Sequence, residues 1–366
     1  MEFELQELSE QVMTARAAHR PVFIRGGGTK DFYGELGALN GKGSHAELDL
    51  SVYRGIVNYQ PSELVITARA GTLVSEIEQT LAEQHQMLAF EPPRFGPGST
   101  IGGCVAAGLS GPRRMAAGSV RDFVLGAKLL NSTGTVLQFG GEVMKNVAGY
   151  DVSRLLAGSM GIFGAMVEVS IKVAPEPFQE NTVVLEVDQA TALAKLNQWR
   201  GQPLPISATA WYAQPDAVVG ELWVRLSGSQ PAVASGGAKL GGQLIDPLAA
   251  ISFWNSLRDQ THPFFQTRPL WRAAVPPATP SLNLGRTLIE WNGGQRWLAD
   301  PAQGGAVRAA VAGCGGHATL FRYESKPDDL SVFHPLETGL MNVSTRLKQE
   351  LDPMGIFNPK RLFSEF

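Results

Sequence analysis

The first hydrophobic positions of the chain recur at helical spacing. Leu5, Leu8, Val12 and Ala15 are three or four residues apart, which places them on one face of a helix. A proline then breaks this pattern, and the short apolar run 22–24 that follows is typical of a buried strand. Because glycines come directly after the run, we expect the strand to end in a glycine-rich turn.

A second strand and helix are predicted shortly afterwards. Residues 64–68 are rich in β-branched side chains and predict a strand, and Gly71 predicts the turn after it. Thr72 is placed to cap a helix that runs to about residue 84. Glu76 would lie early in that helix, where a carboxylate is stabilising. The chain therefore begins with helix, strand, turn, strand and helix.

Later apolar runs predict a hairpin and a further strand. Residues 123–130 and 135–139 are joined by Asn-Ser-Thr-Gly, a natural turn sequence. Residues 167–173 predict another strand, and prolines follow it. By contrast, residues 92–118 consist largely of Gly, Pro, Ser and Ala and have too few large side chains to build a core. We expect that segment to lie against another part of the molecule.

These elements predict an α+β protein with two domains and a tail. We place the first domain at residues 1–175, a second α+β cap or substrate domain at 176–325, and a tail at 326–366 that returns to the first domain. The second domain has alternating strands without comparable glycine loops, and its tryptophans are most simply core or interface residues. They include Trp211, Trp223, Trp291 and Trp297.

Composition narrows the possible partners. With 366 residues, 44% of them hydrophobic, the chain can build more than one core. Lys plus Arg number 31 against 34 Asp plus Glu, so no basic field exists to attract nucleic acid. Cys104 and Cys314 are too few for a disulfide framework or for an iron–sulfur cluster held by this chain alone. Any iron–sulfur relay would belong to a partner.

The first residues of the sequence do not have the pattern expected of an export signal. They are acidic and lack a basic segment followed by an apolar one. No run approaches the ~18 apolar residues that a membrane-spanning helix needs. We therefore expect a cytoplasmic protein.

The first candidate for chemistry is the stretch Arg25-Gly26-Gly27-Gly28-Thr29-Lys30. Glycines after a strand let the backbone approach a phosphate closely, with N–H groups that point inward. The alternative is a purely structural turn in which the two basic residues are solvated flanks. This stretch alone does not decide between the two.

The second candidate is the glycine-rich stretch 97–108. Ser99 or Thr100 would cap a helical turn of small residues, whose free N–H groups are suited to an anion. The alternative is a helix whose glycines only permit close packing. The glycines of residues 41–46 are not a further phosphate-binding motif, because they precede a strand instead of linking a strand to a helix. Taken together, the two stretches favour a phosphate site.

The order of motifs resembles the FAD-binding fold of the vanillyl-alcohol oxidase (PCMH) type, over about residues 20–175. Five motifs carry this resemblance: residues 25–30, 99–103, 118–122, 146–151 and 158–164. The fold that it implies has two small α+β lobes with the pyrophosphate of FAD held between them.

A narrower resemblance spans nearly the whole chain. Residues 110–114, 145–151, 316–322 and 352–359 are similar to the second flavin subunits of bacterial glycolate oxidase. This implies a heteromeric complex that oxidises glycolate to glyoxylate, with a larger flavin subunit and an iron–sulfur subunit as partners. Contact with the inner face of the membrane would then be indirect, through the complex.

The resemblance also implies the cofactor residues. The pyrophosphate would be held by Arg25, Gly26, Gly27, Gly28, Thr29, Lys30, Ser99, Thr100, Ile101, Gly102 and Gly103. The flavin would be lined by Ala106, Gly111 and Gly118, and its ring or ribityl chain approached by Gly164, Met166 and Asn358.

Two departures from the family pattern change the expectation for chemistry. The first loop offers no histidine for a covalent bond, so we expect FAD to be bound non-covalently. Relatives that oxidise 2-hydroxy acids use two histidines around a metal, whereas the six histidines here show no paired ligand spacing, and we expect no metal. We hypothesise that this subunit lacks a complete glycolate site and serves electron transfer or assembly. We assign no catalytic residue.

Alternatives remain open for the whole chain and for single residues. The chain could be a self-sufficient FAD-dependent oxidoreductase of another hydroxy acid or alcohol, or a non-catalytic scaffold. His317 is either a base near the flavin or a structural histidine, and the pair Arg113–Arg114 either binds an anion or faces a partner. Cys104 is expected to serve packing.

Overall fold

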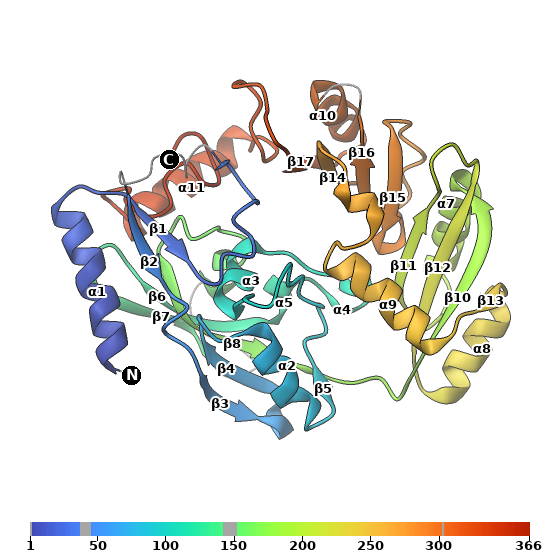
Figure 1. Cartoon of the computed structure of the whole chain (residues 1–366), viewed down its shortest axis with the longest axis horizontal. Coiled ribbons are helices and arrows are strands. Elements are labelled where there is room, and N and C mark those ends of the chain that lie inside the picture. The colour runs from blue at the N-terminus through green and yellow to red at the C-terminus, as the bar shows by residue number, and fades with distance from the viewer. Residues whose placement is uncertain (1, 37–44, 142–151, 302–303) are drawn as a thin grey trace. The chain divides into compact units, whose positions relative to one another are not determined.

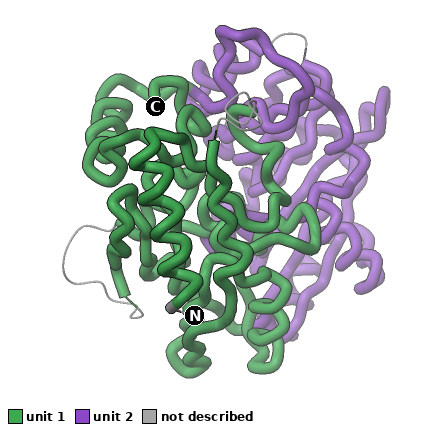
Figure 2. Tube along the Cα trace, turned by 60° about the vertical axis from the view of Figure 1, so that its left-hand side comes forward, with its two compact units in different colours: residues 1–109, 119–175, 335–366 green, residues 110–118, 176–334 purple. Residues whose placement is uncertain are grey.

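The computed structural model describes residues 2–36, 45–141, 152–301 and 304–366 (Figure 1). The chain divides into two compact units (Figure 2). Unit 1 comprises residues 1–109, 119–175 and 335–366, and unit 2 comprises residues 110–118 and 176–334. The tail from residue 335 belongs to unit 1. Residues 110–118 belong to unit 2, which the sequence does not predict.

Unit 1 is built on a five-stranded antiparallel sheet with the strand order β3-β4-β8-β6-β7. Its strands are β3 (Ile56–Gln60), β4 (Val65–Arg69), β6 (Val124–Leu130), β7 (Val136–Gly140) and β8 (Ala165–Lys172). The predicted hairpin is therefore present as β6 and β7, with the Asn131 side chain accepting from the N–H groups of Thr133 and Thr135 in its turn.

A second layer of unit 1 combines helix α1 (Glu2–Ala17) with the parallel strands β1 (Val22–Arg25) and β2 (Ala46–Asp49). Leu8, Val12 and Ala15 are buried, as their spacing predicts. They share one core with residues of β1, of the sheet and of the tail, where Phe357 is fully buried. The tail is therefore part of the core of unit 1. Strands β5 (Gln86–Met87) and β9 (Ala174–Pro175) form a separate pair.

Two helices of unit 1 differ in how their N-termini are capped. Helix α3 (Ile101–Ala107) is capped by the Thr100 hydroxyl, which accepts from Gly103 N–H, as predicted. Helix α2 (Val74–Ala82) has Leu73 at its N-cap, so the predicted cap at Thr72 is wrong. The Thr72 hydroxyl is held elsewhere by the backbone N–H and carbonyl of Gly55. The other helices are α5 (Val120–Phe123), α6 (Val152–Leu156) and α11 (Thr338–Leu351).

Unit 2 is built on an eight-stranded sheet with the order β13-β10-β12-β11-β15-β16-β14-β17. Its strands are β10 (Gln179–Asp188), β11 (Ile206–Tyr212), β12 (Val219–Gly228), β13 (Gln243–Leu244), β14 (Leu270–Ala274), β15 (Arg286–Glu290), β16 (Gln295–Ala299) and β17 (His317–Arg322). Its helices are α4 (Arg114–Ala117), α7 (Gln189–Arg200), α8 (Gln230–Leu240), α9 (Pro247–Arg258) and α10 (Gly304–Gly313).

The two faces of the unit 2 sheet differ. Helices α7, α8 and α10 pack on one face and form two apolar cores with it. On the other face, α9 stacks Phe253 on Trp223 of β12, with ring centroids 3.7 Å apart. Phe265 of the short 3-10 helix Pro263–Gln266 contacts Trp297 of β16. Further along that face, strands β14 and β17 carry Arg272 and His317.

Candidate functional site

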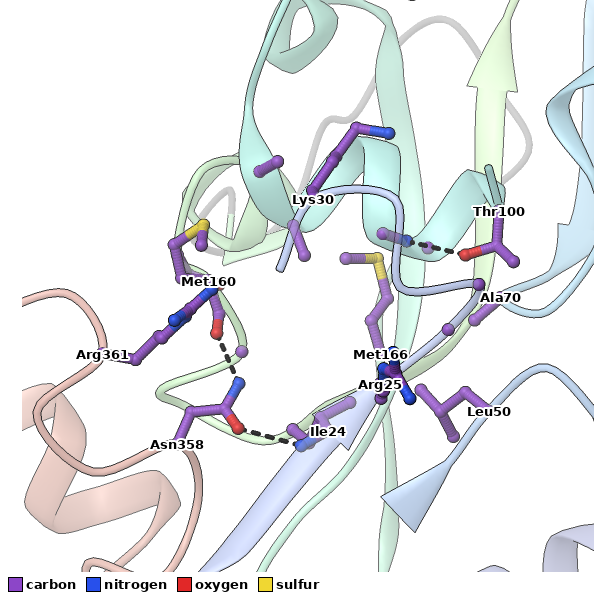
Figure 3. A pocket seen from close by; sticks show the side chains of 18 of the residues that line it. Ile24, Arg25, Lys30, Leu50, Ala70, Thr100, Met160, Met166, Asn358 and Arg361 are labelled. Atoms are coloured by element: carbon purple, nitrogen blue, oxygen red, sulfur yellow. Dashed lines mark hydrogen bonds between the residues drawn. The ribbon is translucent and has the colours of Figure 1, made fainter. Parts of the chain in front are cut away.

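Both glycine-rich stretches line one cavity in unit 1 (Figure 3). The empty space between the lining residues amounts to about 860 Å³, part of it open to solvent. The first stretch follows β1, and the second forms the start of α3. Two segments that the sequence separates by about 70 positions therefore meet at one site.

The two stretches touch through their backbones. A Cβ atom at Gly27 would collide with the carbonyl oxygen of Gly98, and one at Gly26 would collide with the Thr100 hydroxyl. Gly28 has a φ of +69°, a conformation that favours glycine. These glycines are thus required by the approach of the two loops to each other, whether or not a phosphate is bound.

The start of α3 forms part of the cavity wall through Thr100, Gly102 and Gly103. Its first N–H groups are held within the protein. Those of Ile101 and Gly102 donate to the carbonyls of Thr72 and Ala70, and that of Gly103 donates to the Thr100 hydroxyl. A Cβ at Gly102 would lie 2.6 Å from the Cβ of Ala70. Gly102 therefore allows α3 to pack against the end of β4.

Lys30 connects the two stretches by a side chain. Its Nζ donates to the Ser99 hydroxyl at 2.9 Å and lies 5.5 Å from the centroid of the Phe95 ring. Arg25 points its guanidinium at Asp31 instead, with Nη2–Oδ2 at 2.7 Å. The ammonium of Lys30 is therefore the better placed of the two cations for a phosphate at the glycines.

The tail closes another side of the cavity. The Asn358 Oδ1 accepts from the Ile24 N–H at 2.9 Å, and its Nδ2 donates to the Met160 carbonyl at 2.6 Å (Figure 3). Arg361 donates to the backbone carbonyls of Asp31 and Glu35. Both side chains line the cavity and fix the tail to the segments on either side of it.

Most of the predicted cofactor residues line this cavity. They are Arg25, Gly26, Gly27, Gly28, Thr29, Lys30, Thr100, Gly102, Gly103, Ala106, Gly164, Met166 and Asn358.

Other predicted residues do not line it. Ser99 adjoins the cavity through Lys30, and the Ile101 side chain is fully buried in the core. Gly111 and Gly118 belong to unit 2, where the Gly111 carbonyl accepts from the Trp291 indole N–H. The predicted motif at residues 146–151 lies outside the described residues.

Sequence reasoning missed several lining residues, among them Ile24, Leu50, Ala70, Leu129, Met160 and Arg361. Leu50, Leu129 and Met166 give the cavity an apolar part, opposite in character to the glycine loops and Lys30. The lining thus combines the glycine loop and the Lys30 ammonium, which suit a pyrophosphate, with apolar side chains, which suit a flavin ring. The residues present therefore fit the cofactor.

Neither a metal site nor a membrane-spanning helix is found in the part of the chain that the structure describes. No group of three or more His, Cys, Asp and Glu side chains is placed there to hold a metal ion. None of the helices described there has both the length and the apolar character to cross a membrane. Cys104 is fully buried, and its burial raises the pKa of the thiol to about 11.

Comparisons with known proteins agree with this geometry. The FAD binding domain family matches residues 4–140. Two solved structures of alkyldihydroxyacetonephosphate synthase share the fold, with TM-scores of 0.70 and 0.68. The first covers 97% of this chain at 15% identity, and the match spans 75% of that protein. The chain is thus an FAD-binding α+β protein of the vanillyl-alcohol oxidase type.

One relative matches over nearly its whole length. The glycolate oxidase subunit GlcE of Escherichia coli is 43% identical over 98% of this chain and 97% of the relative. The chain belongs to the family of this subunit. The glycolate oxidase subunit GlcD of Bacillus subtilis is 28% identical over 50% of this chain and 38% of its own length. A D-lactate dehydrogenase of Anaerostipes hadrus is 28% identical over 39% of this chain and 30% of its own length.

Proposed function

We propose that this chain is the FAD-binding subunit of a complex that oxidises glycolate to glyoxylate. The observation that carries the proposal is the 43% identity to a glycolate oxidase subunit across 98% of the chain. The cavity in unit 1 supports it, because its residues fit FAD. A larger flavin subunit and an iron–sulfur subunit are the proposed partners, and the two cysteines of this chain agree with an iron–sulfur centre held elsewhere.

Within unit 1, we assign the residues of the cavity to two tasks. The N–H groups of residues 26–28, with the Lys30 ammonium, would bind the pyrophosphate, and the residues Thr100, Gly102 and Gly103 at the start of α3 would lie against it. Leu129, Met166 and Gly164 would contact the apolar part of the cofactor. When bound, FAD supplies the hydride and electron chemistry, and the protein orients it and shields it from water.

FAD would be held non-covalently. The cavity is lined, among the described residues, by no histidine, cysteine or tyrosine, the side chains that would offer a nucleophile for a bond to the flavin. Cys104 lies in α3 but is buried away from the lining, and its raised pKa keeps it a thiol. Retention then depends on the contacts at the loops and the tail.

Turnover measurements test the proposal against two alternatives. Glycolate-dependent reduction of a dye would be measured with this chain alone, with its partner subunits alone and with the complete complex. We expect activity in the complex that requires this chain, and none from the chain alone. Activity of the chain alone at the rate of the complex would instead favour a self-sufficient oxidoreductase.

The scaffold alternative makes a different prediction. A complex rebuilt with a Lys30→Gln, Gly27→Ala double variant should lose FAD from this subunit. Under our proposal, turnover then falls although the complex still assembles. Unchanged turnover without FAD in this subunit would favour a purely structural role.

A further inference from the structure

One region of unit 2 gathers positive charge on a single face of the sheet. In the register of β14 and β17, Arg272 pairs with Thr319, and Ala274 pairs with His317. Paired residues, and residues two apart along a strand, share a face. Arg272, His317 and Thr319 therefore lie on one face, while the alternate positions, such as Leu320, pack into the core with α10.

A second arginine approaches the same place from α4. The guanidinium carbon of Arg114 lies 4.5 Å from the centroid of the Trp291 ring, and that of Arg272 lies 5.8 Å from it. Trp291 is only 5% exposed, and its indole N–H donates to the Gly111 carbonyl. One anchored indole thus holds two guanidinium groups in the same neighbourhood.

Two histidines adjoin these arginines. The rings of His317 and His334 have centroids 6.5 Å apart, and the His334 Nδ1 lies 3.5 Å from the Ala318 N–H. Arg308 of α10 holds the segment before His334 by bonds to the Phe333 carbonyl and to Ser331. His334 is therefore fixed by the fold and does not merely lie on a loose loop.

The charges that act on His317 suit an anion and oppose a metal cation. Burial, and then the positive groups Arg272, His334 and Arg114, lower the pKa of His317. The ring is thus neutral near neutral pH, and the two guanidiniums supply the charge. A divalent cation at the histidine pair would be repelled by both arginines, whereas an anion would be attracted by them.

The turn between β15 and β16 is strained at this point. Trp291 and Asn292 have φ values of +54° and +53°, which residues other than glycine rarely adopt. Thr209 stabilises the turn, since its hydroxyl accepts from the Asn292 N–H and donates to the Asn292 Oδ1. Strain of this kind is concentrated at functional sites. Here it sets the position of the indole on which the two guanidiniums lie.

We propose that Arg114, Arg272 and His317 bind the carboxylate of a small organic acid. A guanidinium matches the two oxygens of a carboxylate with two parallel N–H donors, and a neutral imidazole can add a third hydrogen bond. The neighbouring Arg113 has a different role, because it is buried and pairs with Glu180 and Ser227. The choice of a 2-hydroxy acid, glycolate, as the ligand rests on the proposed function.

Saturation-transfer NMR on the full chain tests the site directly. The probes are glycolate and its neutral amide, glycolamide, with inorganic phosphate as a competing anion. We expect glycolate to bind, glycolamide not to bind, and Arg272→Gln to weaken glycolate binding at least about tenfold, the usual effect of a lost charged hydrogen bond. Arg272→Lys keeps the positive charge but loses the two parallel N–H donors of the guanidinium. Its affinity for glycolate should lie between those of the unchanged chain and of Arg272→Gln.

The matched control is Arg200→Gln, an exposed arginine on α7, the helix layer of the opposite face. It should leave glycolate binding within about twofold. Circular dichroism would show whether each variant is folded, and His317→Asn gives a second test if Arg272→Gln is not. The proposal would be overturned if Arg272→Gln and His317→Asn left glycolate binding unchanged. It would also be overturned if phosphate bound as tightly as glycolate.

This result is separable from the test of the proposed function. A chain that lacks FAD but binds glycolate through Arg272 would contradict the cofactor assignment and keep the carboxylate site. A chain that holds FAD but whose glycolate binding does not depend on Arg272 would support the cofactor assignment and contradict the carboxylate site.

Discussion

Lys348 and Asp352 form a buried ion pair one helical turn apart, with Nζ–Oδ2 at 2.7 Å, at the end of α11. The same ammonium donates to the carbonyls of Ile162 and Phe357, and the carboxylate accepts from the N–H groups of Ile356 and Phe357. The pair therefore fixes the backbone directly before Asn358, the tail residue that lines the cavity. The ion pair thus supports the tail where it meets the cavity.

Replacing Lys348 tests that link. Lys348→Met leaves the Asp352 carboxylate buried without its cation, which should lower the free energy of unfolding by about 3–5 kcal/mol. Urea unfolding measures this change, and absorbance measures the FAD retained. We expect FAD to be lost as well, because Asn358 is no longer held. The exposed Lys360→Met is the control and should change stability by less than about 0.5 kcal/mol. Equal effects of both substitutions would contradict the role of the pair.

Gly27 tests the approach of the two loops. In Gly27→Ala the new Cβ collides with the Gly98 carbonyl, so the loops must separate and the N–H groups leave their positions. We expect FAD affinity, measured by titration of the apo-protein, to fall at least about tenfold. Gly201→Ala is the matched control, since a Cβ there meets nothing within 4 Å. An unchanged affinity in Gly27→Ala would show that the loops do not hold the cofactor.

His317 should report on the positive cluster through its pKa. Burial and the charges of Arg272 on β14, His334 on the segment after β17, and Arg114 on α4 lower this pKa. Arg272→Gln removes one charge, so NMR titration of the ring should show a higher pKa. A bound carboxylate should also raise it, so that glycolate binds more tightly as the pH falls from about 8 to about 6. A pKa that neither change moves would argue against the cluster.

The same lowered pKa affects stability. Below the ordinary histidine pKa, the unfolded chain binds a proton at His317 that the folded chain does not. The contribution of His317 to folding is therefore present above that pH and is lost as the pH falls through the folded-state pKa. His334, whose pKa is lowered by burial and by Arg308, adds a contribution of the same sign.

The two cysteines should differ in reactivity. Burial raises the pKa of Cys104 to about 11, so little reactive thiolate forms. Cys314 is partly exposed. Alkylation of the native chain, followed by mass spectrometry, should modify Cys314 alone, and both residues after denaturation. Labelling of Cys104 in the native chain at the rate of Cys314 would mean that α3 opens readily.

Local signals in the sequence predicted much of unit 1. The spacing of Leu8, Val12 and Ala15 gave the first helix, and the glycines after the first strand gave one wall of the cavity. A cap at Ser99 or Thr100 was predicted from their place ahead of small residues, and the structure has it at Thr100. The cap at Thr72 was wrong, because a tertiary contact with Gly55 takes its hydroxyl.

Features that depend on distant segments were not predictable in this way. Arg361 reaches the cavity only because the tail folds back onto unit 1. The carbonyl of Gly111 anchors Trp291, a residue 180 positions further along the chain. The histidine spacing showed no pair, and His317 and His334 are brought together by the path of the chain after β17. No pattern within one segment carries such information.

The central claim is that this chain holds FAD without a covalent bond. The most direct measurement is the visible absorption spectrum of the purified chain, followed by acid precipitation. We expect flavin bands, with the yellow colour released into the supernatant. A colourless protein that takes up no added FAD, or colour that stays with the precipitate, would contradict it.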